Sequence, residues 1–174
     1  FLTILIPSSF AGLRYGIGTD YFSYQNAFYK IKSNLYVESE FLYLFINKFI
    51  AYIGLEFQLV LFITSFITTL FIYLALRNFK AYIYISIGMF VYMLLYYQIS
   101  FNAIRQIAAM AILLYSVKFI INRNFIKFTI FVIIAMGFHK TAVLFFPLYI
   151  LYYIYSSHKY RIIKIASFTL LIIL

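Results

Sequence analysis

The chain has 174 residues, 66% hydrophobic and 10% charged, which excludes an ordinary soluble domain (about half apolar and a quarter charged) and predicts a membrane protein. A net charge of +10 suggests nucleic acid binding in a soluble protein, but here the positive-inside rule accounts for it, so no nucleic acid partner is expected. The lack of cysteine excludes disulfides, thiolate catalysis and cysteine-ligated metals.

Both ends of the chain are apolar, because it starts at Phe1 and finishes with the run 168–174. We therefore expect residues 1–174 to form a single membrane domain, a fragment that is cut inside a transmembrane span at each end. The first of these spans is expected to end near Leu13.

The most polar stretch of the chain covers residues 14–40. Within it, Gly16 and Gly18 predict a tight turn in front of Asp20, because glycine readily adopts the positive φ angles of such turns. Asp20 then has two interpretations. It is either a general base or cation ligand, or the N-cap of a helix that begins at Tyr21.

The middle of the chain consists of apolar segments of different lengths. The segment 41–55 is too short for a span, which needs about 20 residues, and predicts an interfacial or re-entrant helix. Full spans are expected from Phe57 to about Leu76 and over residues 81–99. A further helix is expected to begin in the stretch 100–111 and to run to about residue 121.

Residues 128–155 form either one long span or a tight hairpin broken near 137–140. The hairpin is favoured because it places the connectors 77–80, 122–127 and 156–161 on one side, which then reads as cytoplasmic. The opposite side carries six cations against all four acids of the chain. The predicted fold is therefore an all-α, polytopic transmembrane protein with a polar outer-face loop. The cytoplasmic side would hold Arg77, Lys80, Lys118, Arg123, Lys127, Lys159, Arg161 and Lys164.

Arg105 is the residue of the stretch 100–111 that is hardest to place in a membrane. On a helix it would share one face with Asn102, three residues before it, and with Gln106, the residue after it. A guanidinium near bilayer depth costs about 2.5–3.5 kcal/mol, so it normally faces a wet cavity or a partner. This cost favours an anion-binding arginine over a structural one that is paired with an acid or with backbone carbonyls.

In this topology seven polar side chains meet on the outer side of the membrane. They are Arg14, Asp20, Asn102, Arg105, Gln106, His139 and Lys140. His139 is part of a polar path or an interfacial residue, and Lys140 either counters a phosphate or extends to lipid headgroups. The set suits an anionic lipid-linked substrate such as a pyrophosphate.

The two histidines of the chain lie on opposite membrane faces in this topology. This argues against haem and against a two-histidine metal centre, so we expect neither a metal nor another cofactor.

Three motifs, taken in their order, resemble the EpsG family of Wzy-like exopolysaccharide and O-antigen polymerases. The segment between the first two motifs is also similar to the family, and the resemblance covers about residues 12–150. Lys140-Thr141 departs from the family pattern, because a small hydroxyl residue is expected directly after the histidine. The motifs are 14–24, 102–108 and 135–142, and the additional segment is 40–47.

The resemblance implies a multi-pass enzyme of the bacterial cytoplasmic membrane that acts at its outer face. Such a glycosyltransferase joins oligosaccharide repeat units carried on undecaprenyl pyrophosphate, by transfer from the carrier to a sugar hydroxyl. The implied partners are this lipid-linked oligosaccharide, the bilayer, and the chain-length regulator and flippase of the same pathway.

The resemblance also suggests roles for the polar residues. Arg105 would stabilise the pyrophosphate leaving group with help from Arg14, and Asp20 or His139 would accept the proton of the acceptor hydroxyl. The residues assigned to catalysis are Asp20, His139 and Arg105. The residues assigned to substrate binding are Arg14, Asn102, Gln106 and Lys140.

Three other functions compete with a polymerase. A transporter or flippase for the same lipid-linked sugars also needs arginines in a cavity but no proton acceptor. A membrane acyltransferase would use His139 as the base on an acyl donor. A non-catalytic membrane subunit predicts that polar substitutions act only through expression.

Overall fold

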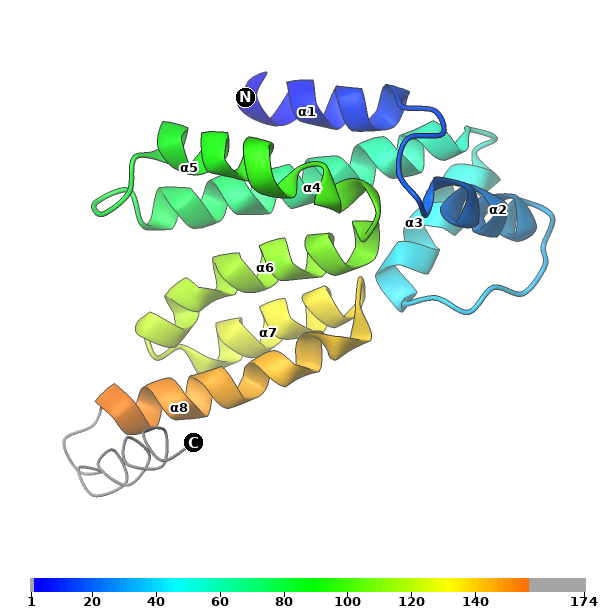
Figure 1. Cartoon of the computed structure of the whole chain (residues 1–174). Helices are drawn as coiled ribbons and strands as arrows, with labels where there is room; N and C mark the ends of the chain where they lie inside the picture. Colours follow the sequence, from blue (N-terminus) through cyan, green and yellow to red (C-terminus); the bar gives the residue numbers. More distant parts are fainter. Residues whose placement is uncertain (1, 157–174) are drawn as a thin grey trace, which may run out of the picture.

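Helices follow one another throughout residues 2–156, the part of the chain that this computed structural model describes (Figure 1). The predicted all-α class is confirmed for this part, which contains no strand. In chain order the elements are α1 (Leu2–Leu13), α2 (Tyr21–Lys32), α3 (Phe41–Tyr52), α4 (Phe57–Asn78), α5 (Ile85–Val91), the π-helical turn η1 (Tyr92–Tyr96), the 3₁₀ turn η2 (Ile99–Phe101), α6 (Ile104–Ile121), α7 (Phe125–Met136), the 3₁₀ turn η3 (Lys140–Phe145) and α8 (Phe146–Ser156).

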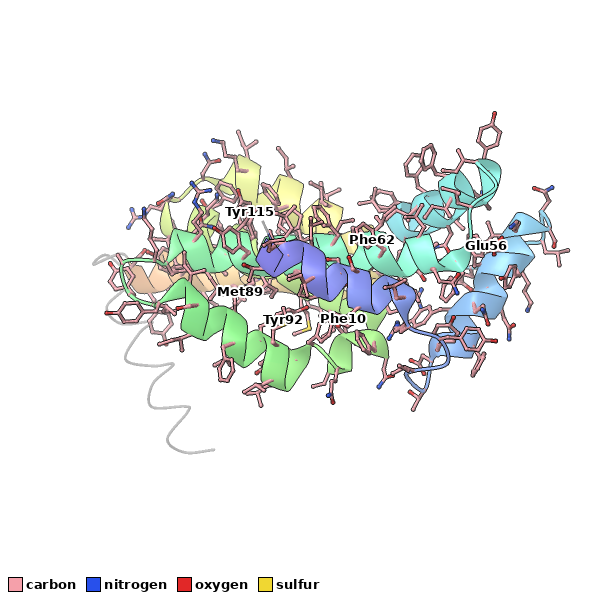
Figure 2. All side chains as sticks on the ribbon, turned by 90° about the horizontal axis from the view of Figure 1, so that it is seen from above. Phe10, Glu56, Phe62, Met89, Tyr92 and Tyr115 are labelled. Atoms are coloured by element: carbon pink, nitrogen blue, oxygen red, sulfur yellow. The ribbon has the colours of Figure 1, made fainter. Side chains whose placement is uncertain are left out.

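The centre of the fold is the pair α4 and α6, with α1 packed on α4 and α7 packed on α6. Ala108 and Ala111 of α6 are both buried, as expected for small residues that let a neighbouring helix approach. The helices α2 and α3 lie together at one end of this bundle, at the right of Figure 1. Figure 2 shows the same end from above, with Glu56 where α4 meets α2 and α3.

Within the described residues, α4 and α6 are long and apolar enough to cross a membrane. The predicted span 57–76 corresponds to α4. The other apolar helices, including α3 with 12 residues, are shorter than a crossing requires. The segment expected as a span over 81–99 starts later, at Ile85, and continues through the π-helical turn instead of one regular helix.

The hairpin predicted over residues 128–155 is confirmed. The helix α7 ends at Met136, and α8 returns alongside it (Figure 1). Arg123 Nη2, at the start of α7, donates to Ser156 Oγ at the end of α8 over 3.2 Å. Figure 1 shows the connectors 77–80 and 122–127 at the end of the bundle away from α2 and α3. The predicted cytoplasmic residues Lys159, Arg161 and Lys164 lie outside the described residues.

The helix expected from the stretch 100–111 begins later than predicted. The structure starts α6 at Ile104, because Ala103 has the non-helical angles φ −93° and ψ 52°. Asn102 lies in the turn in front of it and bonds another backbone segment, a competition typical of asparagine. The prediction that Asn102 shares a helix face with Arg105 and Gln106 is therefore wrong.

Candidate functional site

The loop of residues 14–20, which contains the glycine turn in front of α2, contacts the residues that directly precede α6. Gly16 and Gly18 have φ angles of 67° and 105°, which confirms the predicted turn. Asn102 Oδ1 accepts the backbone N–H of Thr19 over 2.9 Å. A Cβ at Gly18 would lie only 2.8 Å from Asn102 Oδ1, so the contact requires glycine.

Arg14 is held inside this loop. Only 5% of its surface is exposed, and its guanidinium carbon lies 4.2 Å from the centre of the Phe101 ring. Its Nη1 donates to the carbonyl of Ile17 over 3.3 Å, whereas its buried Nε has no hydrogen-bond partner among the described residues. Burial lowers the pKa of Arg14 to about 10, so it still carries its charge at neutral pH.

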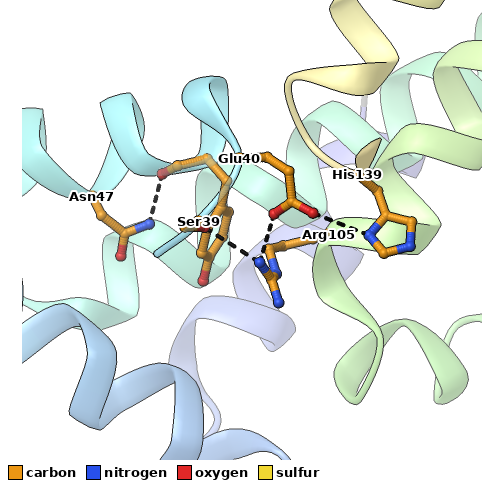
Figure 3. Close-up of polar contacts among 6 residues, drawn as sticks. Ser39, Glu40, Asn47, Arg105 and His139 are labelled. Carbon is orange, nitrogen blue, oxygen red and sulfur yellow. Dashed lines mark hydrogen bonds and ion pairs between the residues drawn. The ribbon is translucent and has the colours of Figure 1, made fainter. Parts of the chain in front are cut away.

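Glu40 joins two of the predicted site residues (Figure 3). Its Oε2 accepts a hydrogen bond from Arg105 Nη1 over 2.5 Å, and its Oε1 lies 3.3 Å from His139 Nδ1. Glu40 directly precedes α3, but its side chain does not cap that helix. Its side chain is 12% exposed, so this carboxylate is withdrawn from solvent and shared between a guanidinium and an imidazole.

Backbone contacts hold the start of α3 against the end of α7. The N–H groups of Leu42 and Tyr43 both donate to the carbonyl of Gly137, over 2.9 and 3.1 Å. A Cβ at Gly137 would lie 2.5 Å from Leu42 Cγ, so a larger residue does not fit without movement. Because His139 is two residues after Gly137, this contact sets its position relative to Glu40.

Arg105 occupies the first turn of α6, where a positive side chain opposes the helix dipole. The carboxylate of Glu40 offsets this effect, and Arg105 Nη1 also donates to Ser39 Oγ over 3.3 Å. The guanidinium carbon lies 5.8 and 5.7 Å from the ring centres of Tyr24 and Tyr43. Arg105 thus has the acid partner that the structural interpretation requires, and the same pair places a cation beside His139.

Opposing effects set the charge of Glu40. Burial acts to raise the pKa of its carboxyl, but hydrogen bonds from its own N–H and from the N–H of Lys140, together with the Arg105 guanidinium, outweigh it. The pKa of Glu40 therefore lies below its usual value, and the group is ionised at neutral pH.

The seven predicted site residues fall into separate groups. Arg14 and Asn102 meet at the glycine turn, whereas Arg105 and His139 meet through Glu40. The two groups are neighbours, because Tyr24 and Tyr43 interact electrostatically with both guanidinium groups. The side chains of three predicted residues are exposed instead: Asp20, Gln106 and Lys140.

Asp20 stands at the N-cap position of α2, but its side chain makes no capping hydrogen bond. The predicted N-cap position of Asp20 is therefore confirmed, but not a capping hydrogen bond from its side chain. Its Oδ1 accepts a hydrogen bond from the Thr19 hydroxyl over 3.4 Å.

Sequence reasoning missed Glu40. One indication was present, because Glu40 opens the segment 40–47, which resembles the family segment between the first two motifs. The other polar residue of that segment, Asn47, is buried and donates to the carbonyl of Tyr43 over 2.7 Å (Figure 3). The side chain of Asn47 therefore has its hydrogen-bond partner within α3, whereas Glu40 contacts Arg105 of α6 and His139 after α7.

The donors at this end of the bundle suit an anion better than a metal. Over residues 2–156, no three His, Cys, Asp or Glu side chains lie close enough to hold a metal ion. The arginine, imidazole and amide groups present are those that bind phosphate or carboxylate oxygens and that move protons.

Comparison with known proteins adds one match. The family model described as EpsG family matches residues 1–174, the whole of the chain. No curated protein matches the chain, and no solved structure matches it.

Proposed function

The chain belongs to the EpsG family, and on this premise we propose that it is a polysaccharide polymerase of the bacterial cytoplasmic membrane. In this proposal it crosses the membrane several times and acts at the outer face. It joins oligosaccharide repeat units by glycosyl transfer from an undecaprenyl pyrophosphate carrier to a sugar hydroxyl.

The observation that carries the proposal is the assembly of Glu40, Arg105 and His139 at the end of the bundle that α2 and α3 cover. The basic connectors lie at the opposite end, which the positive-inside rule assigns to the cytoplasm. A cation for a phosphate and a base for a hydroxyl then lie together on the outer side. A glycosyl transfer from a pyrophosphate carrier needs both.

The reaction proceeds by attack of the acceptor hydroxyl oxygen on the anomeric carbon of the donor sugar. The bond from this carbon to the phosphate oxygen breaks, and the leaving pyrophosphate keeps the electron pair. Arg105 binds the developing negative charge, and the buried cation of Arg14 adds to the local positive potential. Asp20 or His139 accepts the proton of the hydroxyl.

The primary test is Arg105→Ala in the full-length protein in its own host. We expect long chains to disappear from a polysaccharide gel while single lipid-linked units accumulate outside. Arg77→Ala is the matched control, because Arg77 is exposed in the last turn of α4 at the opposite end. Normal chain lengths in Arg105→Ala, at equal membrane levels of protein, would remove the proposed site.

A second substitution tests the geometry of anion binding. Arg105→Lys keeps the charge but loses the planar fork that binds two oxygens at once, so we expect it also to fail. Full polymer output from Arg105→Lys would refute bidentate recognition and leave charge alone as the requirement.

A double replacement of Asp20 and His139 separates the polymerase from a flippase. A flippase needs no proton acceptor, so it should still deliver single repeat units to the outer face. Loss of sugar O-acylation without a change in chain length would favour an acyltransferase instead.

A further inference from the structure

One carboxylate at the proposed site serves two partners. Glu40 lies 2.5 Å from Arg105 through Oε2 and 3.3 Å from His139 through Oε1, so both are in contact with the same group. None of the roles suggested by the resemblance uses Glu40. Its position therefore needs a separate explanation.

His139 Nδ1 is directed toward this carboxylate. The atom is buried and lies 3.3 Å from Glu40 Oε1, and it forms no hydrogen bond with any of the described residues. A buried N–H without a partner is costly, so a small rotation of the ring toward Glu40 is favoured. With its proton on Nδ1, the imidazole would leave Nε2 free to accept a proton on the side away from Glu40 (Figure 3).

Asp20 has no comparable arrangement. Its carboxylate is exposed to solvent, and it accepts a 3.4 Å hydrogen bond from the hydroxyl of the neighbouring Thr19. Of the two candidate bases, His139 is therefore the one that the fold orients.

We propose that Glu40 is a positioning residue that orients His139 as the proton acceptor and that holds Arg105 until a phosphate binds. This inference rests on the proposed polymerase function. When phosphate oxygens bind Arg105, they weaken its pairing with Glu40, and the negative charge of Glu40 acts more fully on His139. Binding of the pyrophosphate would thereby free Glu40 from Arg105 so that it orients His139.

The proton and electrons are accounted for in this step. The acceptor hydroxyl forms its bond to the anomeric carbon and gives its proton to His139 Nε2, and the pyrophosphate leaves with the electron pair of the broken bond. Glu40 stays ionised throughout and stabilises the imidazolium. Arg105 of α6 and Tyr24 of α2 act electrostatically on Glu40, and the Arg105 guanidinium also lies beside the ring of Tyr43 of α3.

Glu40→Gln tests the proposal, because it keeps the shape of the side chain and removes its charge. The rate of polymerisation is measured against pH with membranes that hold the full-length protein and with purified lipid-linked repeat units. We expect kcat to fall by about 100-fold, near the lower limit of what a positioned base contributes, with a smaller change in KM. The acidic limb of the rate profile should move to lower pH, because an imidazolium without its carboxylate partner loses its proton more easily.

Two further variants give the controls. Glu40→Asp keeps the charge and should restore part of the rate and part of the pH position of the acidic limb. Glu38→Gln is the matched control, because Glu38 lies two residues away and is exposed. A rate and pH profile for Glu40→Gln equal to those of Glu38→Gln would overturn the inference.

A purely structural role of Glu40 predicts a different result. It predicts a loss of rate that follows the amount of folded protein and an acidic limb that does not move, and this outcome would also overturn the inference. The proposed function fails separately, if Arg105→Ala and His139→Ala both polymerise normally. A loss of activity in these two variants with a normal Glu40→Gln would remove only the role of Glu40.

Discussion

A single methyl group at Gly137 tests whether the contact between α3 and α7 positions the site. The backbone of Gly137 is helical, at φ −66° and ψ −18°, so alanine is allowed there. Because alanine restricts the unfolded chain more than glycine does, this effect alone would raise the free energy of unfolding by about 0.4–1 kcal/mol. The new Cβ would lie 2.5 Å from Leu42 Cγ and 2.8 Å from Phe41 Cζ. Overpacking of this kind costs about 1–3 kcal/mol.

Leu42 cannot retreat alone, because its own N–H donates to the Gly137 carbonyl over 2.9 Å. We therefore expect Gly137→Ala to lower the free energy of unfolding by about 1.3 kcal/mol, the middle of the overpacking range less the middle of the unfolded-state range. The start of α3 should move away from His139, so polymer output should fall as well. The measurement is a denaturant titration of the full-length protein in detergent, followed by circular dichroism, together with a polysaccharide gel.

Gly54→Ala is the control for this prediction. Gly54 has a φ of 76°, and no atom lies within 4 Å of the place that a Cβ would take, so alanine costs about 1–2 kcal/mol through the backbone alone. It should lose stability to a similar extent without a loss of polymer. An unfolding free energy for Gly137→Ala equal to or above that of the wild type would refute the reasoning from close packing.

Three other outcomes follow from the geometry. Gly18→Ala should shorten the polymer more than Gly16→Ala on a gel, because its Cβ would lie 2.8 Å from Asn102 Oδ1 whereas the nearest atom at Gly16 is 3.6 Å away; equal output would contradict this. Asn124→Ala should lose about 1 kcal/mol of unfolding free energy with normal polymer output, because its Oδ1 accepts an N–H in the first turn of α7; an unchanged titration would show that the cap adds nothing. The lowered pKa of Glu40 stabilises the fold above the usual value of 4.5, and this contribution is lost as the pH falls through the lowered pKa. Denaturant titrations from pH 6 downward should therefore show a steeper loss below about pH 4.5 in the wild type than in Glu40→Gln, and parallel curves would contradict the role of this group.

Local physical chemistry was enough to predict several features from the sequence. The apolar composition predicted helices, and the length of the segment 57–76 predicted the long helix α4. Gly16 and Gly18 predicted the turn that follows Arg14, because positive φ angles are a property of the residue itself. The uneven distribution of the basic residues predicted the hairpin of α7 and α8.

The partners of the polar side chains were decided by the tertiary structure. Glu40 and Arg105 are 65 residues apart, and their contact depends on how α3 docks on Gly137, which no local pattern encodes. The place of Asn102 was also mispredicted, because its bond to the Thr19 backbone competes with the helix that its own sequence favours. Hydropathy and glycine content act within a few residues and can be read along the chain. A buried charge is instead stabilised by whichever partner the packing brings to it, so the Glu40 site emerges only when the helices are assembled.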